Sequence, residues 1–349
     1  MTSIQHLIRK NIRELQPYTS ARNELSGRPL ILLDANENSM GSPLVKWYNR
    51  YPDPLHTSLR EKIATVKNVP ATQIMVGNGS DECIDLLMRV FCEPGKDQVI
   101  ISPPTFEMYS VYAQVNNVTV KTVPLTPEFQ LDLDALERAV NSHTKMIFLC
   151  SPNSPTGNNL YREDMEIVLN NFPGIVVVDE AYINYSRQRS FLAELKDYPN
   201  LVVLQTFSKA WGLAGLRVGM AMASEEIIAA LNSIRPPYNV TSISQELVTE
   251  ALDRLQDVNA MILQTIHLRE GLEAALRTVP AVTKVFPSDT NFLLVEVADA
   301  TAVYNYLKEE GVLVSNKSYM RGCENCLRIS VGTEEENNRL VQLLRQFKK

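Results

Sequence analysis

The feature that most limits the possible folds is a regular alternation of apolar runs with helical patterns between residues 81 and 223. Residues 81–91, for example, place Ile84, Leu87 and Phe91 on one face of a helix. Near-continuous apolar strands are typical of a mostly parallel sheet covered by helices on both faces. The expected strands are Gln98–Ile101, Val118–Val123, Lys145–Cys150, Gly174–Asp179, Leu201–Thr206 and Val218–Ala223.

The pattern changes after a long helical region at 242–276. Strand-like runs then follow at 290–297, 312–315 and 326–331, with helices expected at 299–310 and 334–347. A chain of 349 residues is long enough for two cores. We therefore expect a large α/β domain over residues 31–275 and a small α+β domain made of residues 1–30 and 276–349.

Three polar residues stand at or just beyond the ends of expected strands. Asn153 lies in SPNSPTG, Asp179 in VVVDEAY and Lys209 in QTFSKAW. In α/β sheets, ligands bind outside the carboxyl ends of the strands. A lysine that forms a Schiff base and an acid that pairs with a pyridine nitrogen are what pyridoxal 5′-phosphate (PLP) requires. The order of these motifs predicts a PLP site with Lys209 as the Schiff-base residue and Asp179 at the ring nitrogen.

The cofactor phosphate needs hydrogen-bond donors. The glycine-rich turn GNGSDE at 77–82 runs into a helix, whose first backbone N–H groups favour an anion. Hydroxyl groups and a guanidinium would complete the site from the opposite side. The expected phosphate ligands are Ser80, Asp81, Glu82, Thr206, Ser208 and Arg217.

The cofactor ring needs polar contacts and an aromatic face. Asn153 and Tyr182 are the candidates for hydrogen bonds to the 3-oxygen of the ring. Tyr109, in PPTFEMY, either stacks on the ring or is an aromatic residue of the core. Lys209, once released from the cofactor, would act as the general acid and base.

Several motifs resemble those of a known family. SPNSPTG, VVVDEAY, TFSKAWGLAGLRVG and CLRISVGT resemble the fold-type-I, aspartate aminotransferase-like PLP enzymes, and LDANENSMGSP, NRYPDP and GNGSDECIDLL resemble the histidinol-phosphate aminotransferase family. The resemblance implies a seven-stranded, mostly parallel sheet and PLP as cofactor, with Tyr109 packed on its ring. It also implies glutamate/2-oxoglutarate and histidinol phosphate/imidazole acetol phosphate as substrates, and a homodimer in which Tyr51 reaches the phosphate of the partner's cofactor.

The substrate contacts follow the family pattern less closely. By the resemblance, Arg328 binds a substrate carboxylate or phosphate, assisted by Tyr18. Many family members carry a further arginine where this chain has Ser315, and Lys317 or Arg321 are the candidates to replace its charge. A related threonine-phosphate decarboxylase and an aromatic-amino-acid aminotransferase therefore remain alternative functions.

Composition excludes several classes of protein. The net charge is −6 without a basic block, so no nucleic-acid partner is expected, and no apolar run approaches membrane-spanning length. The five cysteines, an odd number, and the lack of a signal peptide predict a cytoplasmic protein without disulfides. Cys323 and Cys326 form a C-x-x-C pair, but no second pair of ligands accompanies it, so no metal is expected.

Overall fold

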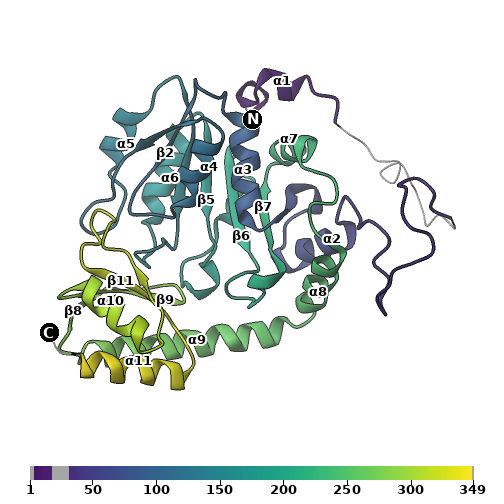
Figure 1. Cartoon of the computed structure of the whole chain (residues 1–349). Coiled ribbons are helices and arrows are strands. Elements are labelled where there is room, and N and C mark those ends of the chain that lie inside the picture. The colour runs from purple at the N-terminus through teal and green to yellow at the C-terminus, as the bar shows by residue number, and fades with distance from the viewer. Residues whose placement is uncertain (1–3, 18–30, 348–349) are drawn as a thin grey trace.

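The larger of two sheets forms the centre of the molecule (Figure 1). The computed structural model describes residues 4–17 and 31–347. The strand order is β1-β7-β6-β5-β4-β2-β3, and β7 runs opposite to all the other strands of this sheet. The strands are β1 (Ile74–Asn78), β2 (Gln98–Ile101), β3 (Thr119–Thr122), β4 (Thr144–Cys150), β5 (Ile175–Asp179), β6 (Leu201–Thr206) and β7 (Val218–Ala223).

The mostly parallel sheet predicted from the apolar runs is thus confirmed. Three predicted strands match the observed bounds, and the other three differ by one residue at an end or at both. The strand β1 was not predicted. Its five residues end in Gly77 and Asn78, and both residue types are depleted in strands.

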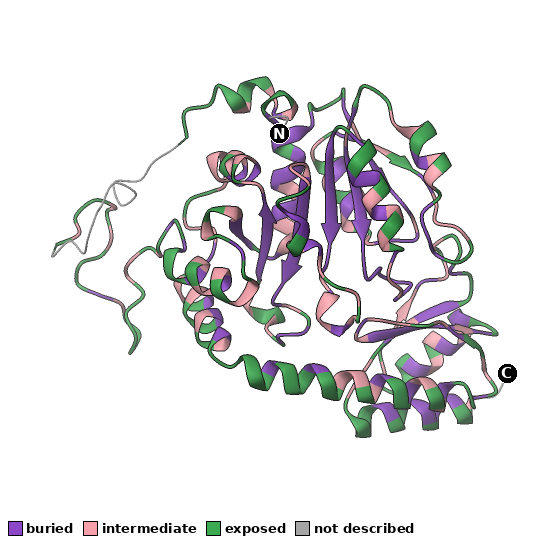
Figure 2. Ribbon diagram, turned by 180° about the vertical axis from the view of Figure 1, so that it is seen from behind, coloured by how far each residue is buried: buried purple, intermediate pink, exposed green. Residues whose placement is uncertain are grey.

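Apart from the edge strand β3, which is mostly exposed, both faces of this sheet are buried. Successive side chains along a strand point to opposite sides, so one strand contributes to two cores. In β5, Val176 and Val178 belong to one apolar core, whereas Ile175 and Val177 belong to the other. Figure 2 shows the buried strands between helices whose outer faces are exposed. The first core is covered by α2 (Thr57–Lys67), α5 (Leu133–Ala139), α6 (Arg162–Asn171) and α8 (Ser242–Leu252), and the second by α3 (Ser80–Phe91), α4 (Met108–Val115) and α7 (Glu225–Ile234).

A second sheet is entirely antiparallel, in the order β10-β11-β9-β8. The expected helical region at 242–276 is two helices, α8 and α9, and α9 joins the two cores through Val258 and Ile262 near one end and Leu272 and Leu276 near the other. The strand β8 was not predicted. The elements are α9 (Leu255–Leu276), β8 (Val282–Val285), β9 (Phe292–Val297), α10 (Ala300–Glu309), β10 (Ser315–Asn316), β11 (Cys326–Ser330) and α11 (Glu334–Gln346).

The N-terminal segment lies on the larger sheet's helices rather than on the second sheet. Ile4 and Ile8 are buried in the core that α3 and α7 cover, and the backbone N–H of Ile4 donates to the Glu226 carboxylate over 3.1 Å. The short helix α1 (Lys10–Arg13) follows. This placement differs from the expected one, because the amphipathic segment buries its apolar side chains against α3 and α7. The division of the chain near residues 30 and 275 stays a prediction.

Candidate active site

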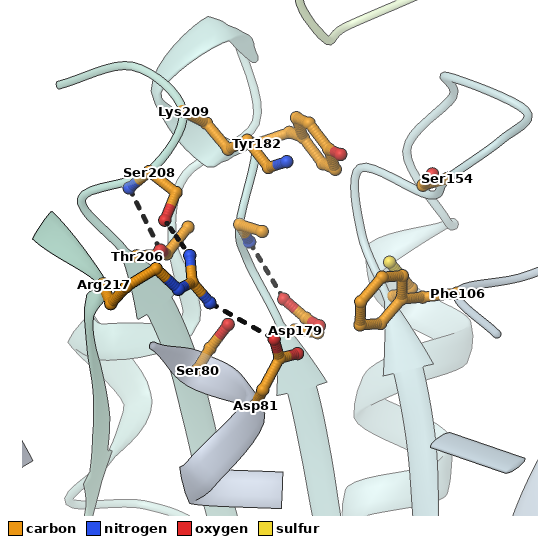
Figure 3. Close-up of a pocket in the computed structure, with 12 residues that line it drawn as sticks. Ser80, Asp81, Phe106, Ser154, Asp179, Tyr182, Thr206, Ser208, Lys209 and Arg217 are labelled. Carbon is orange, nitrogen blue, oxygen red and sulfur yellow. Dashed lines mark hydrogen bonds and ion pairs between the residues drawn. The ribbon is translucent and has the colours of Figure 1, made fainter. Parts of the chain in front are cut away.

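A cavity lies where the carboxyl ends of β5 and β6 meet the N-terminus of α3 (Figure 3). Arg217, Ser208 and Ser80 lie on one side of Asp179, and Phe106 lies on the other. This position is the one that strand order predicts for a ligand. The cavity is lined by Ser80, Asp81, Phe106, Cys150, Ser154, Asp179, Ala181, Tyr182, Thr206, Ser208, Lys209 and Arg217.

Lys209 brings an amine into this cavity. Burial lowers its pKa from the ordinary value, and the positive charge of Arg328 lowers it further. Its Nζ lies 5.5 Å from the centre of the Tyr182 ring. A lysine with a lowered pKa is neutral more of the time, and the neutral amine is the form that attacks a carbonyl group.

Asp179 ends β5 with a buried carboxylate. Burial raises its pKa, while hydrogen bonds from the Tyr109 hydroxyl and the Ala181 backbone N–H, over 2.7 and 3.1 Å, act in the opposite direction. A buried carboxylate that faces a cavity is suited to pair with a protonated nitrogen. The position therefore fits the ring nitrogen of a pyridine.

Two glycines allow the anion-binding side of the cavity to form. A Cβ atom at Gly219 would lie 2.2 Å from the backbone nitrogen of Ser80, so only glycine lets β7 approach the start of α3. Gly79 precedes α3 with φ +76°, and a Cβ there would lie 2.7 Å from Arg217 Nη2. Arg217 itself has φ +54°, a strained value for a residue with a side chain, and such strain is common at functional sites.

The polar groups around this N-terminus contact one another. Arg217 places Nη2 3.4 Å from Asp81 and Nη1 3.5 Å from the Ser208 hydroxyl, and the Ser208 backbone N–H donates to Thr206 Oγ1 over 3.1 Å. A guanidinium, hydroxyl groups and the N–H groups of a helix N-terminus fit a phosphate. The predicted residues Ser80, Asp81, Thr206, Ser208 and Arg217 are thus brought together.

The carboxylate of Glu82 has partners elsewhere. It accepts hydrogen bonds from the backbone N–H of Asn78 over 2.5 Å and from the Asn239 amide over 2.6 Å. Its side chain does not line the cavity, so any role in binding an anion falls to its backbone N–H.

Phe106, which was not predicted, supplies the aromatic wall of the cavity. Tyr109 is completely buried, stacked on Phe148 with 4.7 Å between ring centres, and it meets Phe106 edge-on at 5.4 Å. The two aromatic residues are three positions apart in PPTFEMY. The motif therefore signalled an aromatic residue after β2, but it did not tell which of the two faces the ligand.

Asn153 is buried and, unlike its neighbour Ser154, does not line the cavity. Its amide nitrogen donates to the carbonyl of Pro104 over 2.8 Å and to Thr156 over 2.7 Å, and its oxygen accepts from the Thr105 hydroxyl over 2.9 Å. These bonds fix the loop that carries Phe106. Tyr182 does line the cavity, and burial raises the pKa of its hydroxyl to about 12.

The C-terminal sheet contributes Arg328 to the rim. Arg328 stands opposite Ser315 in the β10–β11 pair and donates to the hydroxyl of Ser154, a cavity residue, over 2.9 Å. Lys317 is buried in an ion pair with Glu107 at 2.7 Å. Arg321 is exposed and lines a different surface groove.

Tyr51 does not line this cavity. Tyr51 is 52% exposed and stacks on Tyr238 with 4.6 Å between ring centres. Tyr18 lies outside the described residues. Their predicted roles stay predictions.

All five cysteines are free and buried, and within residues 4–17 and 31–347 no group of three or more potential ligands could hold a metal ion. In the same part of the chain, no helix has both the length and the apolar character needed to cross a membrane.

Comparison with known proteins agrees with this geometry. The family model described as aminotransferase class I and II matches residues 43–344. A histidinol-phosphate aminotransferase from Cytophaga hutchinsonii is 48% identical over 345 residues, 99% of each chain. The fold also matches a Sinorhizobium meliloti histidinol-phosphate aminotransferase solved with pyridoxal-5′-phosphate, with a TM-score of 0.78, 23% identity and coverage of 85% of this chain and 82% of that one.

The fold alone does not separate the related enzymes. An L-threonine-O-3-phosphate decarboxylase from Porphyromonas gingivalis matches with a TM-score of 0.73 and 24% identity, covering 86% of this chain and 91% of that one. Sequence identity over the full length is the stronger finding. This chain belongs to the class I and II aminotransferases and, within them, to the histidinol-phosphate aminotransferase family.

Proposed function

We propose that this protein uses PLP to transfer an amino group reversibly between glutamate/2-oxoglutarate and histidinol phosphate/imidazole acetol phosphate, a step of histidine biosynthesis. This proposal rests on one observation: the Lys209 amine, the Asp179 carboxylate and the polar groups around Arg217 line the same cavity. Each of these groups matches a different part of one cofactor.

The residues present fit PLP, which supplies an aldehyde for the lysine amine and a ring that accepts electrons. Asp179 would hold the ring nitrogen, and Phe106 and Tyr182 would contact the ring. Arg217 and the start of α3 would hold the phosphate, because the two glycines let β7, the start of α3 and the Arg217 guanidinium come close together.

The chain's own residues then move the proton and hold the substrate. Lys209, whose pKa is lowered by burial and by Arg328, would act as a neutral amine that accepts a proton from the substrate α-carbon and then returns it to a neighbouring atom. A positioned acid and base of this kind contributes roughly 10²–10⁴-fold to a rate. Arg328 would bind the carboxylate of glutamate and the phosphate of histidinol phosphate in turn, because its guanidinium suits both anions.

The proposal includes a homodimer. The segment around residues 31–55 extends away from the body of the molecule (Figure 1) and exposes Ile31, Leu33, Met40, Val45 and Trp47. Several large apolar side chains exposed on one segment favour an interaction with another chain. A second copy of the chain would cover it and receive Tyr51 at its own site. Five free thiols also fit a reducing compartment, the cytoplasm.

The test is a coupled assay of the purified protein loaded with PLP. Formation of 2-oxoglutarate from glutamate should depend on imidazole acetol phosphate. Release of carbon dioxide from threonine phosphate should stay at background. Decarboxylation in place of transamination would assign the protein to the related decarboxylases, and activity with aromatic keto acids alone would make it an aromatic-amino-acid aminotransferase.

A further inference from the structure

Tyr109 and Asp179 form a buried pair that the reaction described above does not explain. The Tyr109 hydroxyl donates to Asp179 Oδ2 over 2.7 Å, although the two residues are 70 positions apart in the chain. Tyr109 is completely buried and does not line the cavity, so it has no direct access to a ligand there. Its hydroxyl instead reaches the chemistry through Asp179, the cavity carboxylate to which it donates.

The phenol is held firmly in place. Its ring stacks on Phe148 and meets Phe106 edge-on, so that little freedom remains about its side-chain torsions. Burial raises its pKa well above the usual range, and the negative charge of Asp179 adds to this effect. The hydroxyl therefore keeps its proton at neutral pH and remains a donor.

The two oxygens of Asp179 are held separately. Oδ2 accepts from Tyr109, and Oδ1 accepts from the backbone N–H of Ala181 over 3.1 Å. A carboxylate oxygen can accept two hydrogen bonds, so each retains a lone pair for a donor in the cavity. The carboxylate is thereby fixed in direction before any ligand binds.

The surroundings make this support necessary, because burial disfavours the ionised carboxylate. The negative charge of Asp81 on α3 disfavours it as well, whereas Lys209 beyond β6 favours it. Donation from Tyr109 is the larger of the two hydrogen-bond effects that oppose burial. The other titratable groups that interact with Asp179 are Cys83 on α3, Cys150 at the end of β4 and Tyr182.

We propose that Tyr109 is a positioning residue, which keeps the Asp179 carboxylate oriented and charged so that it can hold the cofactor's ring nitrogen in its protonated form. This inference rests on the proposed function, because it takes PLP as the ligand. It assigns different roles to the two aromatic residues of PPTFEMY: Phe106 contacts the ring and Tyr109 acts through Asp179.

The test compares Tyr109→Phe with Tyr112→Phe, a change of the same atom on the same helix. Tyr112 lies on α4 and does not line the cavity. Each protein is loaded with PLP that carries ¹⁵N in its ring, and two quantities are measured: the dissociation constant of the cofactor and the ¹⁵N chemical shift. Loss of a hydrogen bond to a charged group should weaken PLP binding roughly 10- to 100-fold in Tyr109→Phe. The ¹⁵N signal should move toward that of the unprotonated ring, and both quantities should stay at wild-type values in Tyr112→Phe.

A double variant separates positioning from packing. If Tyr109 acts through the charge of Asp179, Tyr109→Phe should cause no further loss of PLP affinity in an Asp179→Asn background. An equal loss in both backgrounds, or a wild-type ¹⁵N shift in Tyr109→Phe, would overturn the inference. Failure of the wild-type protein to bind PLP would instead overturn the proposed function.

Discussion

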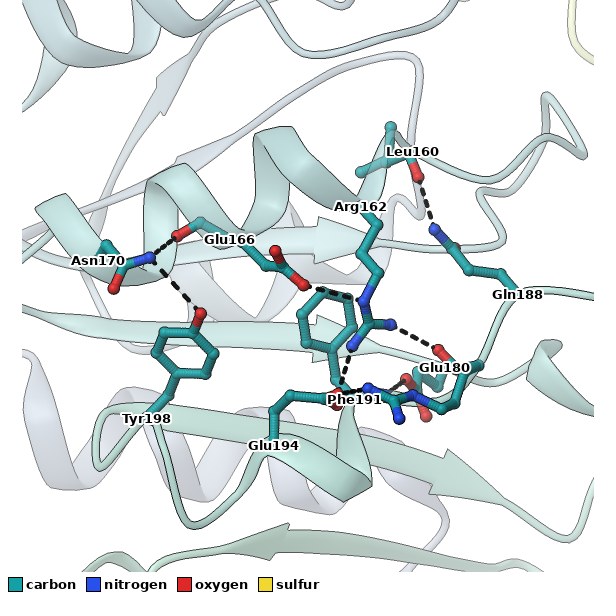
Figure 4. A network of polar contacts seen from close by, with 10 residues as sticks. Leu160, Arg162, Glu166, Asn170, Glu180, Gln188, Phe191, Glu194 and Tyr198 are labelled. Atoms are coloured by element: carbon teal, nitrogen blue, oxygen red, sulfur yellow. Dashed lines mark hydrogen bonds and ion pairs between the residues drawn. The ribbon is translucent and has the colours of Figure 1, made fainter.

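Asp179 and Glu180 are consecutive acids that serve opposite sides of the end of β5. Asp179 lines the cavity, whereas Glu180 is buried on the other side, where it accepts hydrogen bonds from the Ser190 hydroxyl over 2.5 Å and the Phe191 backbone N–H over 2.7 Å. Gln205 donates to it as well, over 2.9 Å. Figure 4 shows Glu180 beside the ion pairs of Arg162. Asp179 is therefore available to a ligand, whereas Glu180 stabilises the fold.

Removing Glu180 should destabilise the protein without altering its cofactor site. Glu180→Ala leaves three donors, two of them buried, without this acceptor, so we expect a loss of roughly 3–5 kcal/mol in the free energy of unfolding. Urea denaturation gives this quantity. The control is Glu166→Ala in the same region, where a partly exposed ion pair with Arg162 is lost and a change below about 1 kcal/mol is expected. Equal losses in the two variants would show that the buried hydrogen bonds of Glu180 contribute no more to the free energy of unfolding than the partly exposed ion pair does.

Asp179→Asn should weaken cofactor binding without destabilising the protein. Because burial raises the pKa of Asp179, the folded protein binds this proton more tightly than the unfolded chain. The group therefore favours folding most below its ordinary pKa, and the advantage is lost as the pH rises through the raised value. At neutral pH the cofactor-free Asn variant should be at least as stable as wild type, although it binds PLP poorly. Destabilisation by more than about 1 kcal/mol would contradict this explanation.

The pH dependence of cofactor binding should report the charge of Arg328. Its positive charge, after burial, lowers the pKa of Lys209. Only the neutral amine reacts, so the association rate of PLP should rise with pH through that pKa. Arg328→Met removes the charge, raises the pKa and should shift the profile to higher pH.

The matched control for this shift is Arg321→Met. Arg321 is exposed and lies away from the cavity, so its loss should leave the profile where it is. If Arg328→Met leaves the profile unchanged, or if both variants shift it equally, Arg328 does not act on Lys209 through its charge.

The sequence predicted the parts of the site that follow the ends of strands. Asp179 directly ends β5, and Lys209 follows β6 within three residues, so strand order was enough to bring them together. Asn153 follows β4 in the same way, but its amide is satisfied by protein partners. Strand order gives the position of a side chain, and the hydrogen bonds of the loop decide where it points.

Contacts between distant segments could not be predicted. Phe106 and Tyr109 lie within one turn of the chain, but the side chain of Phe106 faces the cavity and that of Tyr109 is buried in the core. Likewise, Glu107 pairs with Lys317 across 210 positions, and nothing local to either residue indicates the other. A sequence pattern carries the period of a helix but not the neighbour that each face meets.

Mixing two inactive variants should restore activity if Tyr51 serves the partner's site. Lys209→Ala and Tyr51→Asp are unfolded together and refolded. In a hybrid dimer one site then carries both defects and the other carries neither. Half of the dimers are hybrids at equal input, so about a quarter of wild-type activity is expected. A mixture that contains hybrids and stays as inactive as its parents would show that Tyr51 acts within its own chain.

The most direct test of the whole account is to find which lysine holds the cofactor. The protein loaded with PLP is reduced with borohydride and digested, and the peptides are analysed by mass spectrometry. The account predicts that the reduced cofactor is attached to Lys209 alone and that Lys209→Ala carries none. Attachment to another lysine, such as the buried Lys317, or a labelled Lys209→Ala protein would contradict it.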